Sequence, residues 1–298
     1  AKNDTTAAQY RHLLMPVLSA DTVSKRIVPA SVWAEEAMTV LKFNLTDADV
    51  YLNAVQSTWE GSYLSTAKHM AQQFELKKHA AVMSRATTSK TGRLNLAKLH
   101  QYKFTEDLFI RSMSTPNGKN HGIVLILDGS GSMRGTFAEA MDQTLLFAQF
   151  AYAVGIPFEA YLFTDQQKFA YSYAAQAEGD LGWDLEHTRP YEIQPSSTGR
   201  LVGLINTMDR SKFKTQFRAC LAMRACYSPN ADTNEYTIRA AAQHMPWVHF
   251  AGTPLLTGIM LAERAVASMK AKYRLDKTTF VMVTDGADTN KLRYAVPE

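Results

Sequence analysis

The sequence has little cysteine and no long apolar segment. Its two cysteines, Cys220 and Cys226, are too few for a disulfide-stapled scaffold or a cysteine-rich zinc module. The longest apolar runs, such as 123–127, have the length of a strand and fall far short of the ~20 residues that span a membrane. A basic start followed by an apolar segment is also missing, so nothing indicates secretion. We therefore expect a protein of the reducing cytoplasm.

The sequence also lacks a large excess of charge of either sign. The 32 Lys and Arg residues nearly balance the 28 Asp and Glu residues, and the resulting net charge of +4 is too small to indicate a nucleic-acid-binding protein. Most of the excess lies in residues 68–103, where eight basic side chains face one acidic side chain, Glu75. Such a stretch is typical of a solvated helix face, and it could also meet an acidic partner.

The 298 residues are enough for one large α/β domain or two smaller ones, and the hydrophobic share of 46% excludes disordered and fibrous classes. Residues 1–118 are predicted to be mainly helical, because apolar residues recur at spacings of three and four in 30–40, 48–59 and 62–83. Turn-forming residues at 115–118 mark a boundary. We therefore divide the chain into a helical region, 1–118, and a second region, 119–298.

The second region has the pattern of an α/β domain. Residues 122–127 form an apolar run rich in β-branched side chains, as expected of a central parallel strand. A predicted helix at 137–154 ends at Gly155, and a second strand follows at 158–163. Strand, helix and strand make a right-handed βαβ unit, which predicts an open, mostly parallel sheet flanked by helices.

The rest of this region is predicted to contribute one more helix and strand. Thr253 is suited to the N-cap of a helix that reaches about Lys272, and a buried strand follows at 279–283. Residues 166–248, with helical stretches near 200–208 and 236–244, are interpreted as a large insertion. Only 13 residues follow Asp285, so the C-terminal end of the sheet is expected to be incomplete.

Oxygen-bearing side chains follow two predicted strands and open one helix. Asp128, Ser130 and Ser132 come after the first strand, Thr253 opens the helix, and Asp285 follows the last strand. The carboxyl ends of parallel strands share one edge of a sheet, where ligands bind. Two carboxylates and three hydroxyls without a soft ligand suit a hard cation, Mg²⁺ first, with Mn²⁺ or Ca²⁺ as alternatives.

These residues also fit other interpretations. Ser130 and Ser132 could cap the following helix, and Thr253 could act only as an N-cap. The glycines at 129, 131 and 135 are spaced one residue too widely for a dinucleotide-binding loop, and the phosphate-binding pattern G-x-x-x-x-G-K-[ST] is absent. A G-x-S-x-G nucleophile motif is absent around Ser132.

The motif D-x-S-x-S at 128–132, the distant Thr253 in G-T-P-L and the distant Asp285 in T-D-G resemble the metal-ion-dependent adhesion site of von Willebrand factor A (VWA) domains. The resemblance implies a VWA (Rossmann-like) fold. It also implies that Ser130 and Ser132 are direct metal ligands and that Thr253 binds the metal directly or through water. Asp128 and Asp285 would mainly supply charge.

A helical N-terminal region before such a domain is similar to the cobaltochelatase large-subunit family, including its bacterial and bacteriophage relatives. The similar segments are Gly92–Leu94, Leu125–Gly135, Gly155–Phe158 and Phe163–Thr164. Intracellular VWA proteins often work beside a AAA+ ATPase, so the resemblance implies a partner of the MoxR or chelatase type. The acidic stretch of that family is missing from this sequence.

The first hypothesis is a non-enzymatic, Mg²⁺-dependent binding subunit that captures an acidic residue of an ATPase partner or client protein. Nucleic acid and membrane are not expected partners, and oligomerisation is left open. One alternative is a metal-insertion component of a cobaltochelatase-like enzyme, or a hydrolase that uses the metal to activate water. A second is a structural or adhesion component of a phage particle, and a phage-encoded protein would act in the host cytoplasm.

Overall fold

The computed structural model describes residues 19–85, 120–165, 168, 198–250 and 252–286, together with four short strands. The predicted boundary at 115–118, the segment Gly92–Leu94 and most of 166–197 lie outside the described residues. None of the helices in the described part of the chain has the length and apolar character needed to cross a membrane.

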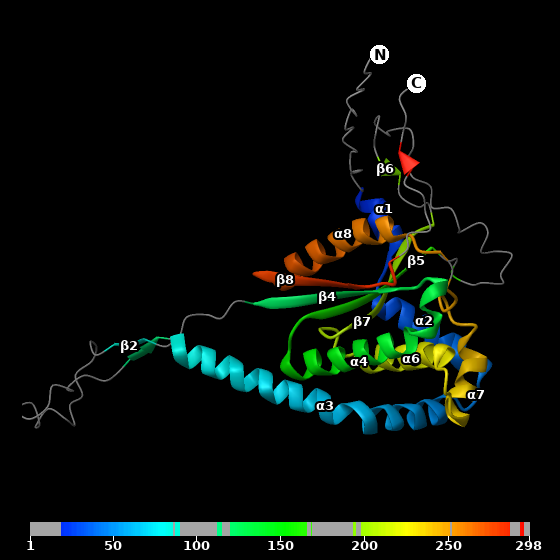
Figure 1. Ribbon diagram of the computed structural model, residues 1–298, viewed down its shortest axis with the longest axis horizontal. Helices are drawn as coiled ribbons and strands as arrows, with labels where there is room; N and C mark the ends of the chain where they lie inside the picture. The colour runs from blue at the N-terminus through cyan, green and yellow to red at the C-terminus, as the bar shows by residue number, and fades with distance from the viewer. Residues whose placement is uncertain are drawn as a thin grey trace, which may run out of the picture.

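The described chain is an α/β structure (Figure 1). Its helices are α1 (Ala20–Arg26), α2 (Ala30–Asn44), α3 (Ala48–Arg85), α4 (Phe137–Val154), α6 (Phe213–Tyr227), α7 (Thr233–Ala242) and α8 (Leu255–Tyr273), with a 3₁₀ turn, η2 (Gly131–Gly135). The strands of its main sheet are β1 (Ile27–Val28), β4 (His121–Asp128), β5 (Phe158–Thr164), β7 (Arg200–Asn206) and β8 (Lys277–Val283). Two small ribbons pair β2 (Thr87–Ser89) with β3 (Ser112–Ser114) and β6 (Ile193–Gln194) with β9 (Arg293–Tyr294).

The main sheet has the strand order β1-β7-β5-β4-β8. β4 lies parallel to both of its neighbours, β5 and β8, and β1 lies parallel to β7. Only the pairing of β5 with β7 is antiparallel. The sheet is therefore mixed but mostly parallel, which confirms the predicted α/β class and the helix-flanked sheet. The prediction that 279–283 is a buried strand is wrong, because β8 stands at the end of this strand order and its Phe280 and Val281 are exposed.

Helices cover both faces of this sheet (Figure 1). On β4, Val124 and Ile126 point to the face covered by α8, where they share a buried cluster with Met260 and Leu261. Leu125 and Leu127 belong to the buried cluster of the opposite face, which includes residues of α2, α4 and α6. A strand that is apolar on both faces is buried on both faces, as the continuous apolar run predicts.

The N-terminal helices belong to the same core as the sheet. Trp33 of α2 and Trp59 of α3 are buried in one cluster with Leu127 of β4 and Phe217 of α6. The described part of the N-terminal region is mainly helical, and its apolar residues share one hydrophobic core with residues that follow the predicted division at 118/119. The predicted helices 48–59 and 62–83 are a single helix of 38 residues, α3, which passes through Gly61 without a break.

The described part of 166–248, the segment interpreted as a large insertion, contributes one strand to the main sheet and two helices. Residues 200–208, expected to be helical, contain β7, a fully integrated strand of the sheet. Residues 213–242 supply α6 and α7, which pack on the same face as α2. The segment RLVGLIN is buried along almost its whole length, so it lacks the alternation that marks a half-exposed strand.

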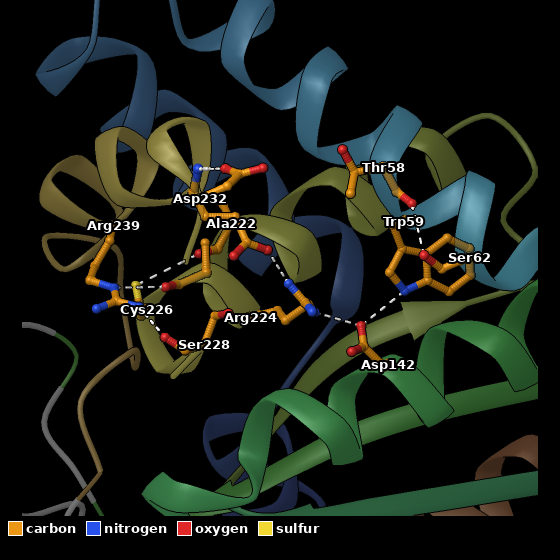
Figure 2. Close-up of polar contacts among 12 residues, drawn as sticks. Thr58, Trp59, Ser62, Asp142, Ala222, Arg224, Cys226, Ser228, Asp232 and Arg239 are labelled. Carbon is orange, nitrogen blue, oxygen red and sulfur yellow. Dashed lines mark hydrogen bonds and ion pairs between the residues drawn. The ribbon is translucent and has the colours of Figure 1, made fainter. Parts of the chain in front are cut away.

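A partly buried ion-pair network joins the helices on one face of the sheet (Figure 2). The carboxylate of Asp142 on α4, with 4% of the residue exposed, accepts hydrogen bonds from Trp59 Nε1 at 2.9 Å and Arg224 Nε at 2.5 Å. Arg224 also pairs with Glu235 of α7. Four helices, α3, α4, α6 and α7, are therefore tied by one guanidinium and two carboxylates.

Removing one member of this network should destabilise the fold. Asp142→Ala leaves Arg224 with Glu235 alone and Trp59 Nε1 without its acceptor, so we expect the free energy of unfolding to fall by about 3 kcal/mol. Asp21→Ala, which removes an exposed pair with Lys25, is the control and should cost at most about 1 kcal/mol. Urea denaturation measures both, and equal losses would contradict the assigned role of the network.

Candidate metal centre

The carboxyl ends of three neighbouring strands meet at one edge of the sheet. Asp128 ends β4, Asp165 follows β5, and Thr284 and Asp285 follow β8. The parallel registers bring them together, because Asp128 pairs with Phe163 of β5 and Leu127 pairs with Val283 of β8. The predicted convergence of Asp128 and Asp285 therefore follows from the parallel order of β4 and β8.

The loop after β4 folds back on its own carboxylate. Asp128 is fully buried, and its Oδ1 accepts a hydrogen bond from the backbone N–H of Ser130 at 2.8 Å. The hydroxyls of Ser130 and Ser132 lie 3.0 Å apart and share a hydrogen bond. Neither η2 nor α4 has a side-chain capping bond at its N-cap residue, so Ser130 does not cap the turn that it precedes. Two hydroxyl oxygens are thus gathered beside a buried carboxylate.

The segment after β8 is bonded to the same carboxylate. Thr284 Oγ1 donates to Asp128 Oδ2 at 2.7 Å and accepts from the backbone N–H of Gly286 at 3.1 Å. Burial raises the pKa of Asp128, the hydrogen bonds from Thr284 and Ser130 oppose that rise, and the negative charge of Asp285 adds to it. Asp285 is therefore close enough to Asp128 for the two charges to interact.

The loop that carries Thr253 is bonded to residues of the same edge that are distant from it in the sequence. The backbone N–H of Gly252 donates to Asp165 Oδ1 at 2.9 Å, and Arg134 Nη2 donates to the carbonyl oxygen of Phe250 at 3.1 Å. Thr253 is 2% exposed. The prediction that it caps the helix is wrong by one residue, because Pro254 occupies the N-cap position of α8.

Two residues of this edge were missed by the sequence analysis. Thr284 is bonded directly to Asp128, and its position before Asp285 in T-D-G was the available signal. Asp165 lies directly after the second strand of the βαβ unit, a place equivalent to that of Asp285 after β8. Burial raises the pKa of Asp165, while the N–H of Gly252 opposes the rise.

The oxygen donors of this edge fit a hard divalent cation. In the described part of the chain, no three His, Cys, Asp or Glu side chains are grouped so that they could hold a metal ion. A site here would depend on hydroxyl oxygens together with Asp128 and Asp285. A hydroxyl that takes part in one hydrogen bond keeps lone pairs for a cation, and oxygen ligands of this kind are those that Mg²⁺ and Mn²⁺ accept.

Comparisons of the chain with protein-family models, with curated proteins and with solved structures found no match.

The glycine between Asp128 and Ser130 is required by close packing. A Cβ atom added at Gly129 would lie 2.9 Å from the carbonyl oxygen of Phe163 and 3.1 Å from the side chain of Leu162. At Gly135, at the other end of η2, an added Cβ would meet nothing within 4 Å. The loop after β4 is therefore fitted against β5.

This difference gives a matched pair of variants. Gly129→Ala forces the loop away from β5 and should lower the free energy of unfolding by about 1–3 kcal/mol, because the contacting atoms are backbone and buried core. Gly135→Ala should not lower it, since its methyl group enters open space. Thermal or urea denaturation compares the two, and equal stability would show that the loop is not held as described.

Proposed function

We propose that this edge of the sheet binds Mg²⁺ and uses it to capture an acidic side chain of another protein. The observation that carries the proposal is the pair of hydroxyls, Ser130 and Ser132, gathered beside the buried carboxylate of Asp128. Ser130, Ser132 and Thr253 would hold the cation, and Asp128 and Asp285 would supply negative charge around it. Mn²⁺ or Ca²⁺ could occupy the same donors.

The chemistry of this donor set favours binding over catalysis. Neutral hydroxyls compensate little of the charge of a divalent cation, so the bound cation supplies an electrophilic centre that accepts a further carboxylate oxygen. Both carboxylate oxygens of Asp128 already accept hydrogen bonds, from Ser130 N and from Thr284 Oγ1. Asp128 is thereby held in place as a fixed charge, in the role that the VWA resemblance assigns to it.

The proposed class is a VWA-type adaptor with a metal-ion-dependent adhesion site. In support, the three parts of the motif occur in order and follow β4, precede α8 and follow β8. By the same resemblance, the partner would be a AAA+ ATPase of the MoxR or chelatase type, or an acidic client protein, in the cytoplasm.

Cation binding is the first test. Calorimetric titration of Mg²⁺ into the protein should give a saturable signal that Asp128→Ala abolishes, because that variant removes the central charge and the acceptor of two hydrogen bonds. The double variant Ser130→Ala, Ser132→Ala keeps that charge and should also lose the signal. Asp276→Ala is the control, since Asp276 accepts from the N–H of Asn120 at the opposite edge of the sheet. Unchanged titration of both site variants would refute the proposal.

Capture of a carboxylate is the second test. When the protein is loaded with Mn²⁺, excess acetate should displace a metal-bound water and lower the relaxation rate of solvent protons, whereas acetamide should not. The physical reason is that an anionic oxygen competes with water at the cation, while a neutral amide competes poorly. An equal response to the two probes, or no response to acetate, would contradict an adhesion role.

A further inference from the structure

The loop that carries Thr253 differs from the other parts of the proposed site in how it is held. Asp128 and Asp285 are attached to strands of the sheet, and Ser130 is bonded to Asp128. Thr253 lies in an irregular segment before α8, and the N-cap of that helix, Pro254, makes no side-chain capping bond. Contacts of the backbone on either side of Thr253 therefore contribute to its placement.

Two side chains hold this loop on either side of residue 251. Arg134, from η2, donates to the carbonyl oxygen of Phe250, and Asp165, after β5, accepts from the N–H of Gly252. Arg134 is exposed and reaches the loop by a long side chain. Asp165 is half-buried and has a short side chain, and its bond is to the backbone of the residue next to Thr253.

Helix α8, which follows the loop, packs against β5, the strand that Asp165 follows. A Cβ atom added at Gly258, in the first turn of α8, would lie 3.1 Å from the ring of Phe163 on β5. Thr257 is buried in the same turn, and a Cβ added at Gly199 would lie 2.6 Å from its side chain. The start of α8 is thus packed on β5 and on the residue that precedes β7, and Asp165 joins the end of β5 to the loop before the helix.

We infer that Asp165 is a positioning residue that holds Thr253 in place for the cation. The inference rests on the proposed function and deepens it. Asp165 accepts the N–H of Gly252 and so orients the backbone there. The orientation of that backbone places the hydroxyl of the next residue, Thr253. A residue of this kind contributes to metal affinity without being a ligand, and the loss of such supporting bonds typically weakens metal binding by 10–100-fold.

A double-mutant cycle tests this role. Mg²⁺ affinity is measured by calorimetry for the wild-type protein, Asp165→Ala, Thr253→Ala and the double variant. We expect each single variant to weaken binding by about tenfold, the lower end of the usual range. The double variant should bind no more weakly than Thr253→Ala, because the bond to Gly252 has nothing left to position once the hydroxyl is gone.

Two further variants separate positioning from charge and from general damage. Asp165→Asn keeps an oxygen that accepts the same N–H, so it should bind Mg²⁺ within about threefold of wild type if position matters. Asp276→Ala removes an equivalent carboxylate-to-backbone bond at the opposite edge and should bind as wild type does. If Asp165→Ala does not fold, Asp165→Ser, which is too short to replace the carboxylate, takes its place in the cycle.

Several outcomes would overturn the inference. Additive losses in the cycle would mean that Asp165 acts independently of Thr253. An Asp165→Asn protein as weak as Asp165→Ala would assign the effect to charge. Wild-type affinity in Asp165→Ala would remove any role for the bond. Absence of Mg²⁺ binding by the wild-type protein would instead overturn the proposed function, and the inference with it.

Discussion

The structure depends on the pairing of β4 with a parallel strand on each side. This pairing buries β4 between α8 and the helices on the opposite face, and it fixes the register of β5 and β8 against β4. Because all three strands run the same way, the residues that follow them emerge at one edge. The position of every candidate ligand except Thr253 is a direct consequence of this constraint.

The loss of hydration of the buried Asp128 carboxylate at that edge must be compensated by hydrogen bonds. Desolvation of Asp128 is opposed by hydrogen bonds from the N–H of Ser130 and the hydroxyl of Thr284, one from its own loop and one from the segment after β8. The same bonds set the shape of the loop, since they hold Ser130 near the carboxylate and leave its hydroxyl beside that of Ser132. The hydrogen bonds that compensate the charge of Asp128 therefore also bring the oxygen donors of the proposed site together.

The parts of the fold that follow from local pattern were predictable. The expected helix 137–154 is α4, and its end at Gly155 coincides with a positive φ of 76° that glycine adopts without strain. The strands β4, β5 and β8 and the convergence of Asp128 and Asp285 also follow from apolar runs and parallel order.

What failed depends on tertiary context. β7 is buried on both faces, so the periodicity of its sequence could not distinguish a strand from a helix. The amphipathic pattern of α2 and α3 predicts a buried face but does not indicate which surface of the protein covers it. The Thr253 N-cap prediction failed by one residue, because α8 begins at Leu255 and Pro254 occupies its N-cap position. Asp165 and Thr284 were missed because their importance lies in bonds to distant segments.

Ser130 and Ser132 are the proposed ligands of a divalent cation at the edge that β4 defines. Anomalous diffraction from crystals grown with Mn²⁺ would locate that cation. We expect one strong anomalous peak within direct coordination distance of both serine hydroxyl oxygens, beside Asp128. No peak at this edge, with the two hydroxyls still hydrogen-bonded to each other, would contradict this proposal.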